Sequence, residues 1–156
     1  MIGVRLSVRL HYVFGETKMA NVITYGTFDL FHIGHLRLLE RARALAGADG
    51  KLIVAVSTDQ FNWNAKKKKC IIPDDQRMAI VAALRCVDKV IPETCWEQKR
   101  KDVVENKVDI FVMGDDWAGK FDFLSDLCRV MYLPRTDGIS TTDLKAKMGG
   151  RCKECR

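Results

Sequence analysis

The chain lacks any apolar stretch as long as the ~18 residues that a membrane span requires, which argues against a transmembrane protein. No secretory leader is expected, because Arg5 and Arg9 interrupt the apolar positions of residues 1–18. The six cysteines are scattered, and Cys152-x-x-Cys155 has no second ligand pair, so neither a disulfide framework nor a zinc site is expected. These absences favour a cytoplasmic protein that folds around an apolar core.

Localised positive charge is also missing, although the net charge is +6. Residues 1–18 hold three basic and one acidic side chain, and residues 146–156 hold four basic and one acidic. The body between them is nearly neutral, with 19 basic and 18 acidic side chains. A protein that binds nucleic acid normally carries its basic residues on its folded face. The charge pattern therefore argues against a nucleic-acid partner.

The length and composition are those of one domain. At 156 residues, 47% of them hydrophobic, the chain can bury its own core, and no repeat, linker or second domain is visible. Residues 1–18 alternate apolar and polar side chains, as an added edge strand would, and are predicted to be an N-terminal extension. Residues 19–148 are predicted to form the working domain and residues 149–156 a basic C-terminal tail.

From Met19 onward, short apolar runs alternate with helical patterns. The runs of strand length are Asn21–Tyr25, Leu52–Ser57, Lys89–Ile91, Ile110–Met113 and Val130–Leu133. The helical patterns are about Gly34–Ala46, Asp74–Leu84, Glu97–Asn106 and Phe121–Cys128, with a last helix from Thr141. Buried strands that alternate with helices pair in parallel through right-handed crossovers. The sequence therefore predicts an α/β fold: a single doubly wound parallel sheet of about five strands, with helices on both faces.

The most informative segment is Tyr25–His35, which predicts the end of a strand, a tight turn and the start of a helix. A helix N-terminus offers free backbone N–H groups and the positive end of the helix dipole, so it attracts phosphate. His32 and His35 lie in the first turn, where they could donate hydrogen bonds to phosphate oxygens. The alternative is a satisfied surface pair or a partial metal site, but zinc would lack the rest of its ligands.

Three residues around the histidines have expected structural roles. Gly26 is expected to let the chain turn sharply after the strand, and Asp29 to cap or brace that turn. Gly34 is expected to let a ligand approach the backbone closely. Together they strengthen the interpretation of this segment as a phosphate site equipped for chemistry.

Three other polar segments follow predicted strands, and the carboxyl ends of parallel strands meet at one edge of the sheet. Arg135–Thr142 combines an arginine, a turn glycine and hydroxyl groups, which suits a di- or triphosphate better than a plain capped helix does. Lys66–Lys69 is either a solvated loop or an anion site at that edge. Asp115 and Asp116 are helix-capping residues, Mg²⁺ ligands or an acid–base pair, although nothing nearby suggests hydrolysis.

The motifs together resemble a known family. Gly26-Thr27-Phe28-Asp29 followed by His32-x-Gly34-His35 resembles the signature of the Rossmann-like nucleotidyltransferases, whose HxGH motif is shared with class I aminoacyl-tRNA synthetases. The segments Trp96–Lys99, Met113–Phe123 and Arg135–Thr142 narrow the resemblance to cytidylyltransferases that act on glycerol 3-phosphate. This resemblance covers about residues 19–148.

The resemblance implies a reaction. CMP would pass from CTP to sn-glycerol 3-phosphate by direct in-line attack, giving CDP-glycerol and pyrophosphate; choline phosphate or another small phosphorylated alcohol is the alternative acceptor. The product would serve teichoic-acid or capsule synthesis. Mg²⁺ would accompany CTP, and the protein would be a homodimer with Arg85 and Asp88 near the interface. Two alternatives are not enzymes: a nucleotide-binding module that has lost activity, and a structural protein that binds a polyanion.

The resemblance also implies which residues form the site, and it assigns no metal-ligating residue. The catalytic residues would be His32, His35, Lys66 and Arg135. The nucleotide-binding residues would be Gly26, Thr27, Phe28, Asp29, His32, His35, Lys68, Asp116, Arg135, Thr136, Gly138, Ile139, Ser140, Thr141 and Thr142. The acceptor substrate would be bound by Lys66, Trp96 and Lys99. Which lysine of Lys66–Lys69 takes which role stays open.

Overall fold

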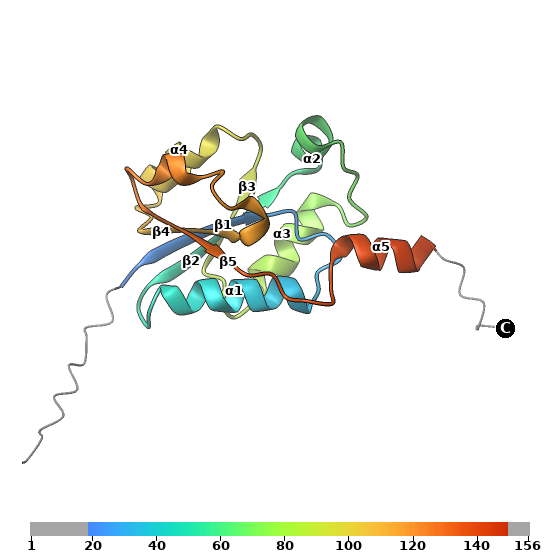
Figure 1. Cartoon of the computed structure of the whole chain (residues 1–156), viewed down its shortest axis with the longest axis horizontal. Helices are drawn as coiled ribbons and strands as arrows, with labels where there is room; N and C mark the ends of the chain where they lie inside the picture. The colour runs from blue at the N-terminus through green and yellow to red at the C-terminus, as the bar shows by residue number, and fades with distance from the viewer. Residues whose placement is uncertain (1–18, 150–156) are drawn as a thin grey trace, which may run out of the picture.

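The computed structural model describes residues 19–149, which form five strands and the helices around them (Figure 1). The strands are β1 (Asn21–Gly26), β2 (Lys51–Ser57), β3 (Lys89–Glu93), β4 (Ile110–Gly114) and β5 (Arg129–Leu133). The α-helices are α1 (Ile33–Leu45), α2 (Asp59–Lys66), α3 (Asp74–Ala82), α4 (Gln98–Glu105) and α5 (Thr141–Gly149). Two single-turn 3₁₀ helices, η1 (Asp115–Trp117) and η2 (Asp122–Leu124), connect β4 to β5. The predicted edge strand and, apart from Gly149 at the end of α5, the predicted basic tail lie outside the described residues.

The five strands form one parallel sheet in the order β3-β2-β1-β4-β5. The central strand β1 pairs with β2 on one side and with β4 on the other. The chain thus winds outward from β1 in one direction and then, after β3, crosses to the other side. Open sheets of this kind bind ligands beyond the carboxyl ends of the strands, where the winding direction reverses. The expected doubly wound α/β fold is confirmed.

Each face of the sheet is covered by helices, as Figure 1 shows. On one face, Val22 of β1 packs with Leu39 of α1 and with Val81 of α3. On the other face, the next residue of β1, Ile23, lies in a core cluster that includes residues of α4 and η2. Side chains that alternate along a strand point to opposite faces, so the apolar run of β1 supplies both cores at once.

Two sequence expectations about helices were wrong. The segment Phe121–Cys128 holds the single turn η2 and no longer helix, because Phe121 and Leu124 turn inward and the Tyr132 hydroxyl accepts a hydrogen bond from Phe121 N–H. The helix α2 was missed because its residues were assigned to the loop after β2. Its start carries a local signal, since Thr58 Oγ1 accepts a hydrogen bond from Phe61 N–H as an N-cap residue does.

The last helix, α5, starts at Thr141 as predicted and buries none of its residues. It lies beyond the carboxyl edge of the sheet, near the start of α1 (Figure 1). Within residues 19–149, the longest helices are too short and too polar to cross a membrane.

Candidate active site

A cavity of about 550 Å³ opens at the carboxyl edge of the sheet. Its walls come from the segments that follow β1, β2, β4 and β5, together with α1 and the start of α5. The predicted site residues that line it are Gly26, Thr27, Phe28, Asp29, His32, His35, Lys66, Lys68, Trp96, Lys99, Asp116, Arg135, Thr136, Ile139, Ser140, Thr141 and Thr142. Gly138 does not line the cavity; it makes the turn of its loop with a φ of 77°. The structure thus brings residues from distant parts of the sequence around one space.

The two histidines cap α1. His32 Nδ1 accepts a hydrogen bond from Gly34 N–H at 3.1 Å, and His35 Nδ1 accepts one from His32 N–H at 3.3 Å. This is the reciprocal pattern of a capping box, with imidazole nitrogens in place of the usual hydroxyl and carboxylate. Two amides that were expected to be free for phosphate are therefore already bonded. What faces a ligand at these positions is the imidazole edge.

The caps fix the protonation of both rings. A nitrogen that accepts a hydrogen bond carries no proton, so each neutral imidazole has its hydrogen on Nε2. Burial, and next the neighbouring His32, lower the pKa of His35 to about 3. Burial and the charge of Arg135 also lower the pKa of His32. At neutral pH the stacked pair, with ring centroids 3.8 Å apart, therefore carries two neutral Nε2–H donors, and that of His32 lies 3.4 Å from Thr141 Oγ1.

The turn between β1 and α1 is built differently from the expectation. Phe28 and Leu30 adopt left-handed backbone conformations, with φ of 54° and 48°, whereas Gly26 ends the strand with no positive φ. A Cβ atom on Gly26 would lie 2.8 Å from the Phe28 ring. A Cβ atom on Gly34 would lie 2.8 Å from the His32 ring. Both glycines thus make room for neighbouring side chains. The expected role of Gly26 in turning the chain was wrong, whereas Gly34 lines the cavity, and close approach of a ligand to it stays a prediction.

Asp29 braces the turn, as expected. It does so by bonding the segment that follows Lys66–Lys69 and a lysine of α5. Its buried carboxylate accepts hydrogen bonds from Ile71 N–H and Ile72 N–H, each at 2.9 Å, and pairs with Lys145 at 2.8 Å. Burial alone would raise the pKa of Asp29, but the Lys145 and amide hydrogen bonds hold it below its usual value. Thr141 Oγ1 donates to the Asp29 carbonyl at 3.0 Å. The start of α5 is thereby attached to the segment that carries the histidines.

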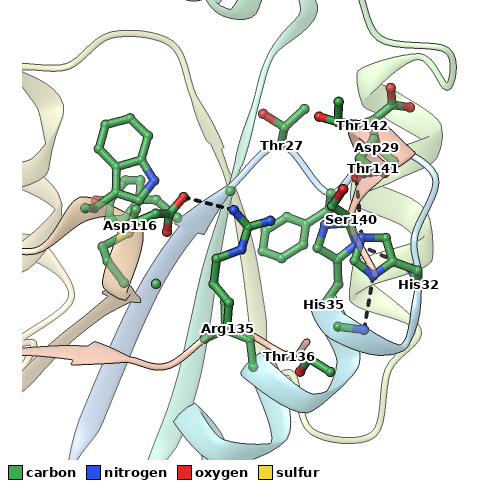
Figure 2. A pocket seen from close by; sticks show the side chains of 18 of the residues that line it. Thr27, Asp29, His32, His35, Asp116, Arg135, Thr136, Ser140, Thr141 and Thr142 are labelled. Atoms are coloured by element: carbon green, nitrogen blue, oxygen red, sulfur yellow. Dashed lines mark hydrogen bonds and ion pairs between the residues drawn. The ribbon is translucent and has the colours of Figure 1, made fainter. Parts of the chain in front are cut away.

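Arg135 extends from the end of β5 into the cavity. Its Nη1 lies 3.7 Å from Asp116 Oδ2, and in the view of Figure 2 its guanidinium lies between Asp116 and the two imidazoles. The arginine side chain is 56% exposed, so its donors are accessible to a ligand. Ser140 Oγ accepts from Asp143 N–H at 3.0 Å, which confirms that this loop ends in the N-cap of α5.

Lysines and a buried carboxylate from α2, β3 and α4 line another part of the cavity, the lysine end. Lys99 Nζ lies 2.6 Å from Glu93 Oε1, with the two side chains 1% and 2% exposed. Lys66 Nζ lies 4.0 Å from Glu93 Oε2 and donates to Ser57 Oγ at 3.2 Å. Burial lowers the pKa of Lys66, and the charge of Glu93 opposes this. Lys66 is the last residue of α2, and Lys68 also reaches the cavity, whereas Lys67 takes a left-handed conformation and does not line it.

Two residues that support the site have no recognisable signal in the sequence. Arg77 is fully buried, and its guanidinium donates to the carbonyls of Thr27, Ser57 and Ile72. It therefore holds together three segments at the carboxyl edge. Glu93 ends β3 and bonds both Ser57 and Lys99. Neither residue stands in a motif, and only the packing of distant segments gives them partners.

The chain is similar to known nucleotidyltransferases. The family described as cytidylyltransferase-like matches residues 23–147. The chain is 55% identical over 132 residues to the glycerol-3-phosphate cytidylyltransferase of Bacillus subtilis (strain 168), a match that covers 85% of this chain and 99% of that protein. The glycerol-3-phosphate cytidylyltransferase of Staphylococcus aureus (strain NCTC 8325 / PS 47) is 53% identical, over 85% of this chain and 98% of that protein.

A solved structure supports the fold. The crystal structure of the lipopolysaccharide core biosynthesis protein from Thermoplasma volcanium GSS1 superposes with a TM-score of 0.63 at 27% sequence identity, covering 76% of this chain and 97% of that one. The fold, the histidine cap and the match over most of the chain agree with one another. The chain belongs to the cytidylyltransferase-like family.

Proposed function

We propose that this protein transfers CMP from CTP to sn-glycerol 3-phosphate, releasing pyrophosphate and forming CDP-glycerol. The observation that carries this proposal is the 55% identity over nearly the full length of a glycerol-3-phosphate cytidylyltransferase. The cavity at the carboxyl edge of the sheet supports the proposal, because histidines, lysines and an arginine loop surround a space large enough for a nucleotide.

The chemical step needs positioning and charge stabilisation more than it needs a base. An oxygen of the acceptor phosphate attacks the α-phosphorus of CTP, a new P–O bond forms, and the bond to pyrophosphate breaks on the opposite side. The attacking phosphate is already an anion at neutral pH, so no side chain has to remove a proton. Catalysis then depends on holding the two phosphates in line and on stabilising the charge of the transition state.

His32 and His35 are proposed to act on the α-phosphate and on the leaving oxygen. Their Nδ1 atoms are held by backbone amides, so the Nε2–H groups are oriented before substrate binds. Donors that need no reorganisation are the kind that favour a transition state over the ground state. Burial disfavours the charged form of both imidazoles, so the donors are neutral before CTP binds.

The triphosphate is proposed to extend from the histidines to the loop before α5. Arg135 would form charged hydrogen bonds with the β- and γ-phosphates, where Lys68 adds positive charge. The segment Thr136–Thr142 would contribute hydroxyl and amide donors. Gly26–Phe28 would pack their backbone against the nucleotide, and Asp29 would position the turn. Asp116, next to Arg135, would orient the guanidinium at the same end.

The acceptor phosphate is proposed to bind near Lys66. The buried ammonium group of Lys99 would add positive charge there, and the Trp96 ring would contact the acceptor. Lys66 is the more accessible lysine, because its side chain is 16% exposed and that of Lys99 only 1%. For an in-line reaction, an attacking oxygen held there would approach the α-phosphorus opposite the departing pyrophosphate.

Mg²⁺ is proposed to enter with CTP. Among residues 19–149 no group of three His, Cys, Asp or Glu side chains is placed to hold a metal ion. Mg²⁺ commonly keeps several waters and binds one or two carboxylates together with substrate phosphates, so Asp116 beside the triphosphate loop fits it. The ion would offset negative charge on the phosphates.

The assembly and the cellular setting complete the proposal. A homodimer in the cytoplasm is proposed, with Arg85 and Asp88 near the subunit interface. In the single chain, Asp88 accepts a hydrogen bond from Leu52 N–H at 2.8 Å and pairs with Arg43 at 3.5 Å. Sedimentation of the purified protein tests the dimer.

The experiment that tests the function is a matrix of pyrophosphate-release assays. CTP, ATP, GTP and UTP are each combined with glycerol 3-phosphate, choline phosphate and ethanolamine phosphate. Release with CTP and glycerol 3-phosphate, well above every other pair, is expected. Higher turnover with choline phosphate would establish the alternative acceptor, and absence of turnover with all twelve pairs would contradict the enzyme proposal.

A further inference from the structure

An aromatic box at the lysine end of the cavity already contains a positive charge. Lys99 Nζ lies 4.6 Å from the ring centroid of Tyr25, 4.6 Å from that of Trp96 and 5.5 Å from that of Phe121. A cation within about 6 Å of an aromatic centroid is attracted by the electron-rich face, and more strongly when water is excluded. The Lys99 side chain is almost fully buried, so its ammonium group is such a desolvated cation.

Glu93 adds a carboxylate to this box. It accepts a hydrogen bond from Ser57 Oγ at 2.5 Å and lies 2.6 Å from Lys99 Nζ. Aromatic faces, here supplemented by a carboxylate, are the groups that recognise ammonium ligands. Without the lysine, the box would have the composition of an ammonium-binding site. The protein fills it with an ammonium group of its own.

The box borders the cavity in which the acceptor substrate is proposed to bind. Tyr25, Glu93, Trp96 and Lys99 all line that cavity. Lys66 Nζ stands 5.4 Å from the Trp96 centroid, so Trp96 contacts both ammonium groups. The two ammonium groups face Trp96 together, where they attract a phosphate and repel a cationic headgroup, while the second carboxylate near the box, that of Asp102, accepts a hydrogen bond from the Tyr25 hydroxyl at 2.7 Å.

We propose that Lys99 restricts the acceptor to phosphorylated alcohols without a positive charge, because its ammonium group occupies the aromatic box that a cationic headgroup would need. This inference rests on the proposed function. A quaternary or primary ammonium headgroup would have to displace a buried ion pair from the three rings, and the displaced Glu93 would lose its partner. An uncharged polyol phosphate requires no such displacement, so Lys99 is a specificity-determining residue.

The first test measures binding of an ammonium ion to the aromatic box and does not depend on catalysis. Lys99→Ala empties it, whereas Lys99→Met fills it with an unbranched apolar chain. Thermal unfolding is followed in tetramethylammonium chloride and in sodium chloride at equal ionic strength. Tetramethylammonium should raise the Tm of Lys99→Ala by about 2–4 °C and leave the unmodified protein and Lys99→Met unchanged. Equal Tm shifts in all three proteins would overturn the proposal.

A second variant covers the case in which Lys99→Ala fails to fold, since Glu93 would then be buried without Lys99. Lys99→Ala combined with Glu93→Gln removes both charges and keeps the three rings. This double variant should still bind tetramethylammonium through the aromatic faces, with a smaller Tm shift. Absence of any shift in the folded double variant would likewise overturn the proposal.

The kinetic test compares acceptors. The ratio of kcat/KM for choline phosphate to that for glycerol 3-phosphate should rise about tenfold or more in Lys99→Ala. Lys120→Ala is the matched control, because Lys120 is exposed, lies 4.9 Å from the single ring of Trp117 and does not line the cavity; its ratio should not change. An unchanged ratio in Lys99→Ala would overturn the inference. Inactivity of the unmodified protein toward every acceptor would instead contradict the proposed function.

Discussion

Replacement of His35 by glutamine separates two roles of one imidazole. Glutamine is a usual N3 residue of a capping box, because its side-chain oxygen accepts the hydrogen bond from the N-cap amide. In His35→Gln, the amide of His32, which now donates to His35 Nδ1 at 3.3 Å, keeps an acceptor. The imidazole Nε2–H donor is lost. The start of α1 should therefore remain intact while the transition state loses one oriented hydrogen bond.

The size of the effect follows from that lost donor. Removal of one oriented donor to a transition-state oxygen costs about 3–4 kcal/mol, which is a hundredfold or more in kcat. His35→Ala removes the cap as well, at a further cost of about 1 kcal/mol of stability. It also removes a ring whose centroid lies 5.4 Å from those of Phe28 and Phe31. Alanine should thus lower both stability and turnover, and glutamine turnover alone.

Pyrophosphate release at saturating CTP and glycerol 3-phosphate measures kcat for the three proteins, and thermal unfolding measures their stability. We expect His35→Gln to unfold within a few degrees of the unmodified protein, with a kcat at least about a hundredfold lower. Near-normal turnover in His35→Gln would refute the role of Nε2–H. Activity losses in proportion to the unfolded fraction would refute it too.

Three further predictions concern the pH dependence of stability, the attachment of α5 and the position of the His32 imidazole. Because the pKa of His35 is about 3 in the folded chain against its ordinary 6.5, the unfolded chain binds the extra proton below pH 6.5. The free energy of unfolding in urea should therefore be about 2 kcal/mol lower at pH 5 than at pH 7, and an unchanged value would contradict the low pKa. Lys145→Met breaks the pair with Asp29 and should raise the KM for CTP about tenfold, whereas Lys147→Met, on the same helix, should not; equal effects of both would argue against the attachment. Gly34→Ala places a Cβ 2.8 Å from the N-cap imidazole of His32, which must shift, and should lower kcat with little change in Tm; a kcat equal to that of the unmodified chain would contradict this.

The sequence was sufficient for features that depend on local pattern. The run Leu52–Val56 is apolar on every residue, and the run around Ile23 is interrupted only by Thr24, so both predict strands buried on both faces; they are β2 and the central strand β1. Strand ends in a parallel sheet meet at one edge, which is why Arg135 and the histidines could be expected near one another. The start of α2 could have been predicted too, because Thr58 precedes it as a cap.

Features that depend on tertiary partners could not be predicted. Glu93 and Lys99 are six positions apart on different elements, and only the turn between β3 and α4 brings them to 2.6 Å. The role of Gly34 depends on the rotamer of His32, which the sequence does not specify. Histidine is uncommon as a capping residue. Nothing in the sequence therefore indicated that two backbone amides at the start of α1 are already hydrogen-bonded to imidazoles.

The most direct test of the account is a crystal structure of the protein with CTP. We expect the α-phosphate within hydrogen-bond distance of Nε2 of His32 and His35. The β- and γ-phosphates should contact Arg135 and the hydroxyls of Ser140–Thr142. A triphosphate that contacts the arginine loop but leaves both imidazoles without a phosphate oxygen, or one that binds outside this cavity, would contradict the central claim.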